Sequence, residues 1–323
     1  MIKLPAPKIA WGCSGTLKGK FKGRDLISIR DLSRPDIEEI LDLAEIMSKT
    51  KRLEVAHDKL ATLFFFEPST RTRLSFEAAM YRLGGHCLSI HDVRSTSLEK
   101  GESLSDTFRV LDSYGDVLLI RHSDPSVVRL AADVAVNPVI NAGSGADEHP
   151  TQALIDAYTI KKSFGRLDGL NFCIFGDLKY SRAARSLLLL LSKFKTKVYL
   201  VAPPGLEMER AITERAGQIP LEKGELREII GELDVLYVTR LQKERFPSIE
   251  EYEKYKGSYR ITLDSLKGCK ESLIVIHPLP RVDELDKNID STPHAMYFQQ
   301  AALGISLRMA LLVLTLGLEE RIG

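Results

Sequence analysis

Short apolar runs alternate with longer stretches in which apolar residues recur every three or four positions, along almost the whole chain. The short runs are typical of buried strands, and the longer stretches are typical of amphipathic helices. Strands that alternate with helices in this way predict parallel sheets covered by helices on both faces. The sequence therefore predicts an α/β fold with two doubly wound domains, whose parallel sheets are joined by bridging helices.

The first half of the chain shows the alternation clearly. Ser33 and Pro35 introduce the first helical pattern, and Gly84 with Gly85 marks the end of the second, since glycine is common just past a helix. The expected elements are a helix over 36–47, a strand over 60–66, a helix from about 70 to 84, and strands over 86–91 and 116–121 with a helix over 103–113 between them.

The second half of the chain shows the same alternation of strands and helices. The full chain has 323 residues, a length that favours two domains over a single hydrophobic core. A long helix over 149–164 ends at Gly165 and bridges the halves, and an amphipathic helix over 306–318 closes the chain. Strands are expected over 171–175, 197–201, 234–238 and 273–276. We therefore expect one domain over 1–149, completed by a C-terminal helix over 295–323, and a second domain over 150–294.

Composition narrows the class of protein. The chain has 45 Lys plus Arg residues and 44 Asp plus Glu residues, which gives a net charge of +1. A protein with so little net charge has no strong positive field to attract nucleic acid or anionic lipid. The four cysteines lie far apart without paired spacing, which argues against a zinc site or a disulfide framework and favours a reducing cytoplasm. The longest apolar run, over 187–191, is far shorter than the roughly 20 residues of a membrane span. We expect no membrane segment.

An anion site is expected where the strand over 60–66 leads into a helix, at Ser69-Thr70-Arg71-Thr72-Arg73. Free N–H groups at a helix start and the helix macrodipole attract phosphate, and hydroxyls add donors without bulk. Guanidinium groups match phosphate oxygens, so Arg71 is the expected ligand and Arg73 a structural residue. The alternative is an ordinary capping serine with solvated arginines. Two hydroxyls interleaved with two arginines after a buried strand favour the phosphate site.

Three further arginines lie at, or shortly after, the carboxyl ends of predicted strands: Arg121, Arg182 and Arg240. Open α/β sheets bind ligands at the carboxyl ends of their strands, so three arginines there indicate a polyanionic ligand. Arg182 belongs to a strand–turn–helix segment at 171–182 that superficially suggests a dinucleotide fold. That segment has Gly176 but lacks the further glycines of the dinucleotide fingerprint, which weakens a nucleotide-dependent oxidoreductase.

Two other segments carry candidate polar groups. His149 opens the bridging helix after Gly143 and Gly145 and is placed to donate to a developing oxyanion, with Gln152 on the same helix face. The two prolines of His-Pro-Leu-Pro-Arg at 277–281 withhold N–H donors, so the carbonyls of this stiff turn are suited to an NH2 group. A rigid turn without a ligand is an equal alternative. The polar loop 96–102 alone indicates only a flexible loop.

Taken together, these stretches resemble the carbamoyltransferase family from about Gly23 to the C-terminus. Residues 69–73 match its carbamoyl phosphate signature, and His-Pro-Thr-Gln at 149–152 is also family-wide in outline. Residues 239–245 and 277–284 look like its aspartate-specific branch. An ornithine-specific member would be expected to have cysteine in place of Pro278 and a Ser-Met-Gly motif on an aspartate-bearing loop, and this sequence has neither.

The resemblance implies carbamoyl transfer from carbamoyl phosphate to L-aspartate, giving N-carbamoyl-L-aspartate and phosphate in pyrimidine synthesis, with no metal or organic cofactor. The implied catalytic residues are Arg71, Thr72, Lys100, Arg121, His149 and Gln152. Carbamoyl phosphate would contact Ser69, Thr70, Arg71, Thr72, Ser97, Lys100, Arg121, His149, Gln152, Pro278 and Leu279. Aspartate would contact Lys100, Arg182, Arg240 and Gln242.

The resemblance also implies partners. Ser97 and Lys100 match a loop that the family inserts into the site of a neighbouring subunit, so a homotrimer with shared active sites is expected. Regulatory chains and a dihydroorotase are the further partners it allows. An ornithine-type enzyme and a non-catalytic subunit of the same fold are the alternatives. A retired site has no physical reason to keep six polar side chains, which speaks against the second: Arg71, Lys100, Arg121, His149, Arg182 and Arg240.

Overall fold

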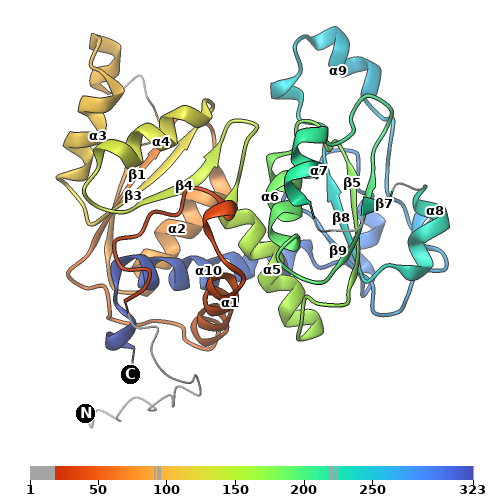
Figure 1. The fold of residues 1–323 in the computed structure, drawn as a ribbon, viewed down its shortest axis with the longest axis horizontal. Coiled ribbons are helices and arrows are strands. Elements are labelled where there is room, and N and C mark those ends of the chain that lie inside the picture. The colour runs from red at the N-terminus through yellow and green to blue at the C-terminus, as the bar shows by residue number, and fades with distance from the viewer. Residues whose placement is uncertain (1–18, 91, 93–95, 218–220, 223–224, 323) are drawn as a thin grey trace.

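A computed structural model describes residues 19–90, 92, 96–217, 221–222 and 225–322. Two parallel sheets lie side by side with helices around them (Figure 1), so the predicted fold class is confirmed. The first sheet has the order β2-β1-β3-β4 and the second the order β7-β6-β5-β8-β9. The strands are β1 (Leu60–Phe65), β2 (His86–Ile90), β3 (Val117–His122), β4 (Val139–Ser144), β5 (Asn171–Gly176), β6 (Lys197–Val201), β7 (Leu221–Glu222), β8 (Val235–Thr239) and β9 (Ile274–Ile276).

The helices cover the sheets and connect them. Ser33 caps the first helix through a reciprocal bond pattern with Asp36, which satisfies free N–H groups at its start. Gly165 ends the fifth helix with a φ of 72°, a conformation that glycine adopts readily. The helices are α1 (Arg34–Ser48), α2 (Thr70–Arg82), α3 (Leu104–Asp112), α4 (Pro125–Val134), α5 (Pro150–Phe164), α6 (Arg182–Leu191), α7 (Arg210–Ala216), α8 (Leu226–Ile229), α9 (Ile249–Tyr255) and α10 (Tyr297–Leu316).

The strand order determines where a ligand fits. In the first sheet, β1 pairs with β2 on one side and with β3 on the other, so the direction of strand addition reverses at β1. In the second sheet, β5 is likewise flanked by β6 and β8. Crevices open at the carboxyl ends of the strands where the order reverses in this way. The segments after β1 and β3, and those after β5 and β8, are therefore the expected positions for ligand-binding residues.

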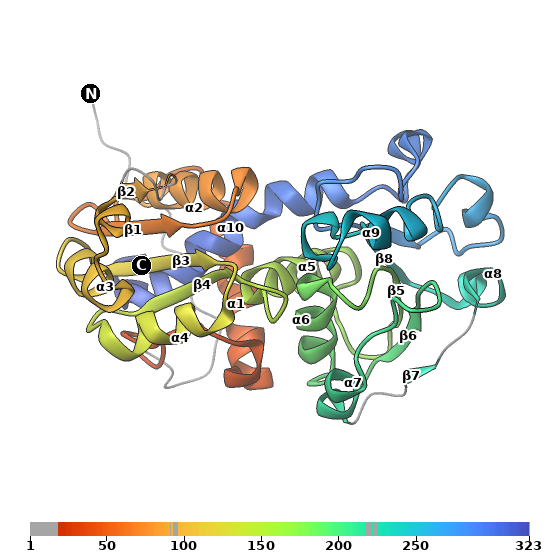
Figure 2. The same cartoon turned by 90° about the horizontal axis from the view of Figure 1, so that it is seen from above.

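Helices α5 and α10 join the two halves (Figure 2). α10 packs against α1, α2 and α5 and then reaches β9 of the second sheet. The expectation of a final helix over 306–318 is confirmed in its position up to Leu316, but its start and its amphipathic character were wrong, because α10 begins at Tyr297 and is buried along most of its length. Among the described residues, α10 is the one helix that is long and apolar enough to span a membrane. The shorter apolar runs in the sequence did not predict this. However, 72% of the apolar stretch of α10 is buried inside the protein. Packing between the two halves explains its apolar character.

Candidate active site

A cleft of about 1130 Å³ lies between the two sheets. Its walls come from the segments after β1, β3, β5, β8 and β9 and from the starts of α2, α5 and α6, as the strand order leads one to expect. The sequence-predicted residues that line it are Ser69, Thr70, Arg71, Thr72, Arg121, His149, Gln152, Arg182, Arg240, Gln242, Pro278 and Leu279. Ser97 and Lys100 do not line it; they lie in a short 3-10 helix, Ser97–Lys100, with both side chains exposed.

The first wall of the cleft is the start of α2. Ser69 occupies the N-cap position, but its side chain makes no capping hydrogen bond, and the first turn has no acidic residue. The Ser69 hydroxyl and the first N–H groups of α2 are therefore available to bind an anion. Partial burial, together with the nearby Arg240, lowers the pKa of Arg71. Arg73 instead pairs with Glu77 at 3.0 Å, which fits the structural role expected for it.

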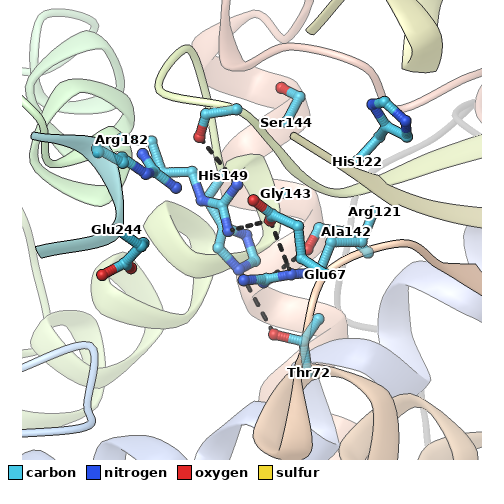
Figure 3. Close-up of polar contacts among 12 residues, drawn as sticks. Glu67, Thr72, Arg121, His122, Ala142, Gly143, Ser144, His149, Arg182 and Glu244 are labelled. Atoms are coloured by element: carbon cyan, nitrogen blue, oxygen red, sulfur yellow. Dashed lines mark hydrogen bonds and ion pairs between the residues drawn. The ribbon is translucent and has the colours of Figure 1, made fainter. Parts of the chain in front are cut away.

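Two arginines meet at Glu67, a residue for which the sequence suggested no role (Figure 3). Oε2 of Glu67 lies 3.2 Å from Nε of Arg121 and 3.1 Å from Nη2 of Arg182. A Cβ atom at Gly143, where φ is 124°, would stand 3.1 Å from the guanidinium carbon of Arg182 and 3.2 Å from Nη1 of Arg121. Glycine at position 143 thus lets the two guanidinium groups approach the floor of the cleft. The signal for Glu67 in the sequence was its place between a buried strand and the anion-binding turn.

Burial and repulsion between neighbouring guanidinium groups lower the pKa values of these arginines. Burial, with Arg182 nearby, lowers the pKa of Arg121 to about 9. Burial and the same Arg182 lower the pKa of Arg245 to about 10, and its Nη1 donates to the Tyr180 carbonyl at 3.0 Å. Groups held this close in a poorly solvated cleft favour an added anion, because it relieves their repulsion. The cluster is therefore suited to a ligand with several negative charges.

Arg308 adds a further positive charge that the sequence reading missed. It lines the cleft from α10, and its guanidinium lies 5.0 Å from the Phe76 ring centre. Burial lowers its pKa to about 9. Nη1 donates to the Gly304 carbonyl at 3.2 Å, but Arg308 forms no ion pair within the part of the chain that the structure describes. Arg308 lies in the final helix, which the sequence predicted to be amphipathic, and an arginine in such a helix is expected on its solvent-exposed face.

His149 stands at the start of α5, between the anion site and the arginine cluster. Its backbone N–H donates to Oγ of Ser186 at 2.8 Å, which fixes the helix start. The ring nitrogens lie 3.5 Å from Oγ1 of Thr72 and 3.4 Å from Oγ1 of Thr151, at the long limit of hydrogen bonding. Burial, with Arg182 and Arg121 nearby, holds the pKa of His149 well below its usual range. The imidazole is neutral at pH 7 and can donate one hydrogen bond to a ligand oxygen.

The opposite wall follows β8. Arg240 pairs with both carboxylate oxygens of Glu244, at 2.5 and 3.1 Å, and Nε2 of Gln242 donates to the Arg240 carbonyl at 3.1 Å. The Glu244 carboxylate shows how Arg240 grips a carboxylate in a bidentate manner. A bound carboxylic acid can exchange with this exposed partner. This wall therefore suits a second, carboxylate-bearing ligand.

The turn after β9 completes the cleft. Leu279 has a φ of 55°, an unusual conformation for a residue with a branched side chain. A buried pair supports the turn: Nε2 of His277 lies 2.7 Å from Oε1 of Glu284, and both side chains are nearly inaccessible. The sequence analysis named the segment 277–284 but gave no role to the side chains of His277 and Glu284, and it did not identify Asp156 or Gln300. The described residues contain no cluster of three or more His, Cys, Asp or Glu side chains placed to hold a metal.

A two-walled cleft with a phosphate-type helix start on one side and a carboxylate-gripping arginine on the other defines a class of enzyme that joins two small anions. Comparisons with known proteins agree. Residues 24–162 match the family model of the aspartate/ornithine carbamoyltransferase carbamoyl-P binding domain, and residues 168–315 match that of the Asp/Orn binding domain. The chain belongs to the carbamoyltransferase family, and within it to the aspartate carbamoyltransferase catalytic chains.

Relatives and solved structures support that placement over most of the chain. The aspartate carbamoyltransferase catalytic subunit of Pyrobaculum islandicum is 52% identical over 302 residues, which cover 92% of this chain and 99% of the relative. That of Thermococcus onnurineus is 51% identical, with 93% and 99% covered. A Trypanosoma cruzi aspartate transcarbamoylase in complex with carbamoyl aspartate and phosphate has a TM-score of 0.88 at 39% identity, covering 92% of this chain and 98% of that one.

Proposed function

We propose that this chain transfers the carbamoyl group of carbamoyl phosphate to the amine of L-aspartate, giving N-carbamoyl-L-aspartate and phosphate in de novo pyrimidine synthesis. The observation that carries the proposal is the single cleft in which the start of α2 faces Arg182 and Arg240. Trypanosoma cruzi structures of the same fold are described in complex with carbamoyl phosphate, with aspartate and with N-(phosphonacetyl)-L-aspartic acid. Those ligands have the charges that the two walls can accept.

The walls divide the substrates between them. Residues 69–72 hold the phosphate, and Arg121 contacts both the phosphate and the carbamoyl oxygen; the fact that all of them line one cleft supports this assignment. His149, which is neutral, and the hydroxyl of Thr72 polarise the carbamoyl carbonyl. Gln152 and the carbonyls of Pro278 and Leu279 orient the carbamoyl NH2. Arg182, Arg240 and Gln242 receive the two carboxylates of aspartate.

Catalysis rests on alignment and electrostatics. When the amine nitrogen forms its bond to the carbamoyl carbon, the carbonyl oxygen gains negative charge beside His149 and Arg121. Preorganised donors at such an oxygen are worth several kcal/mol, and holding both substrates in line contributes a similar amount. The carbon–oxygen bond to phosphate then breaks, and the departing phosphate takes the amine's proton. The charges of Arg71 and Arg121 stabilise that leaving group.

The active enzyme is a homotrimer that shares its sites, in the cytoplasm. Ser97 and Lys100 contribute to the cleft of a neighbouring subunit, and their exposure outside the cleft of their own chain supports this assignment. The division at residue 149 assigns carbamoyl phosphate to the first domain, with α10, and aspartate to the second. Titration with N-(phosphonacetyl)-L-aspartic acid tests the joint site: tight binding is expected, and an absence of binding would identify a non-catalytic subunit.

A further inference from the structure

Asp156 is a fully buried carboxylate under the floor of the cleft, on α5 one turn after Gln152. Its Oδ1 accepts hydrogen bonds from two amides. One comes from Nε2 of Gln152 at 2.8 Å, and the other from Nε2 of Gln300, in the first turns of α10, at 2.5 Å. Both glutamines line the cleft, whereas Asp156 does not. The carboxylate therefore joins two lining residues that lie far apart in the sequence.

The carboxylate decides which way each amide faces. A carboxylate oxygen that accepts two hydrogen bonds requires the NH2 end of both glutamines, so both carbonyl ends must face elsewhere. Among the described residues, Oε1 of Gln152 accepts no hydrogen bond. The bond from Nε2 to Asp156 therefore fixes the amide so that its carbonyl is a free acceptor on a residue that lines the cleft.

The same orientation supports the turn after β9. Oε1 of Gln300 accepts the backbone N–H of His277 at 2.9 Å, at the point where the turn begins. Nδ1 of His277 then accepts the backbone N–H of Leu279 at 2.8 Å. Pro278 has no N–H group, and the N–H of Leu279 is already used inside the turn. The turn can therefore offer the cleft only carbonyl oxygens.

We propose that Asp156, acting through Gln152 and Gln300, is a positioning residue that holds the carbonyl acceptors of the carbamoyl-binding region in place, so that this region selects a ligand NH2 group. This inference rests on the proposed function and extends it to the basis of selectivity. An NH2 group meets acceptors from α5 and from the turn, and a methyl group in its place leaves those acceptors unsatisfied. A buried acceptor without a partner is costly, so the region rejects the methyl analogue.

The ionisation state of Asp156 does not alter the network. Burial raises the pKa of Asp156 to about 7. Oδ2 of Asp156 and the hydroxyl of the nearby Tyr237 both lack a hydrogen-bond partner among the described residues, so a proton can reside on Oδ2 while Oδ1 still accepts from both glutamines. Asparagine in the same orientation reproduces that protonated form. Leucine has a similar shape but offers no acceptor at all.

The test compares two stable phosphonates that differ only in the group of interest. Phosphonoacetamide carries the amide NH2, and acetonylphosphonate carries a methyl group in its place; inorganic phosphate reports on the start of α2 alone. Calorimetric titration of the intact protein should show that the wild type prefers the amide by roughly 10-fold or more. Asp156→Leu should bring that ratio to within about twofold while phosphate affinity is retained, and Asp156→Asn should keep the wild-type ratio.

Matched variants separate positioning from folding. Tyr237→Phe removes the neighbouring hydroxyl but leaves the Oδ1 bonds, so its ratio should equal that of the wild type. If Asp156→Leu does not fold, Gln300→Met removes the second link and should also lower the ratio. An unchanged ratio in the folded Asp156→Leu or Gln300→Met protein, or an equal loss of all three ligands, overturns the inference. Failure of the wild type to bind either phosphonate would instead overturn the proposed function.

Discussion

Oε2 of Glu67 lies 3.1 Å from Nη2 of Arg182, and this contact ties the segment after β1 to the start of α6 on the opposite wall of the cleft. The same carboxylate oxygen lies 3.2 Å from Nε of Arg121. One negative charge therefore holds one buried and one partly buried cation that would otherwise repel each other. Their placement at the two walls depends on a residue that the proposed chemistry does not use directly.

The first prediction concerns this carboxylate. Glu67→Gln should reduce kcat/KM for aspartate on the order of 10-fold or more, because Arg182 loses its charged partner in a poorly solvated site. Steady-state kinetics with aspartate as the varied substrate measure the effect. Glu77→Gln is the matched control, since Glu77 pairs with Arg73 at 3.0 Å on α2, away from the two walls. Equal effects of the two substitutions would contradict the role of Glu67.

His149 should act as a neutral hydrogen-bond donor. His149→Ala should lower kcat by roughly 10²-fold with little change in phosphate affinity, because a donor to the developing oxyanion is lost. Burial and the nearby Arg182 and Arg121 hold the pKa of His149 well below its usual range. Protonation of this ring should therefore not limit kcat between pH 6 and 8. A wild-type kcat profile that falls near pH 6.5, and loses that fall in the variant, would show the opposite.

Asp156 should leave a signature in the pH dependence of stability. Burial raises its pKa to about 7, while the unfolded value is near ~3.9. Between those pH values the folded chain holds a proton that the unfolded chain has lost, so its contribution to the free energy of unfolding falls as the pH rises through that window. Asp156→Asn removes this loss. Its stability relative to the wild type should rise from pH 5 to pH 8, by on the order of 1 kcal/mol or more.

Chemical denaturation at the two pH values measures that difference. Asp58→Asn is a suitable control, because Arg321 lowers the pKa of this exposed carboxyl to about 2, outside the window tested. Its stability relative to the wild type should be the same at pH 5 and pH 8. If Asp156→Asn behaves like this control, Asp156 does not hold a proton in the folded protein near neutral pH.

Shared active sites predict complementation between two inactive chains. A Lys100→Ala chain keeps its own cleft intact, and an Arg71→Ala chain keeps the exposed Lys100 that it lends. Trimers reassembled from equal amounts should recover about a quarter of wild-type activity, since about one site in four combines two intact contributions. Each variant treated alone should stay inactive. Mixed trimers without activity would mean that Lys100 does not serve a neighbouring site.

The sequence predicted those parts of the molecule that local signals specify. The start of α2 and the ends of α5 are encoded by hydroxyl, proline and glycine residues next to apolar patterns. β4 and α4 were missed. The polar residues of β4 are not typical of a buried strand. Their burial is tolerated because Asn141 donates hydrogen bonds to the Ile27 carbonyl at 2.8 Å and to Oγ of Ser144 at 3.1 Å.

The missed site residues have a common physical cause. Asp156 and Gln300 are separated by 144 positions, and Glu67 and Arg182 by 115, so no local pattern links them. Each is a charged or amide side chain whose partner is brought near only by the packing of α10 or α6. The residues that line the cleft could largely be predicted from motifs, whereas the residues that orient them could be found only in three dimensions.

The acceptor specificity of the purified protein tests the central claim most directly. Incubation with carbamoyl phosphate and either L-aspartate or L-ornithine, followed by mass spectrometry and a phosphate assay, identifies the product. We expect N-carbamoyl-L-aspartate and phosphate in equal amounts, and no citrulline above the uncatalysed background. Citrulline from ornithine, with no carbamoyl aspartate from aspartate, would contradict the account.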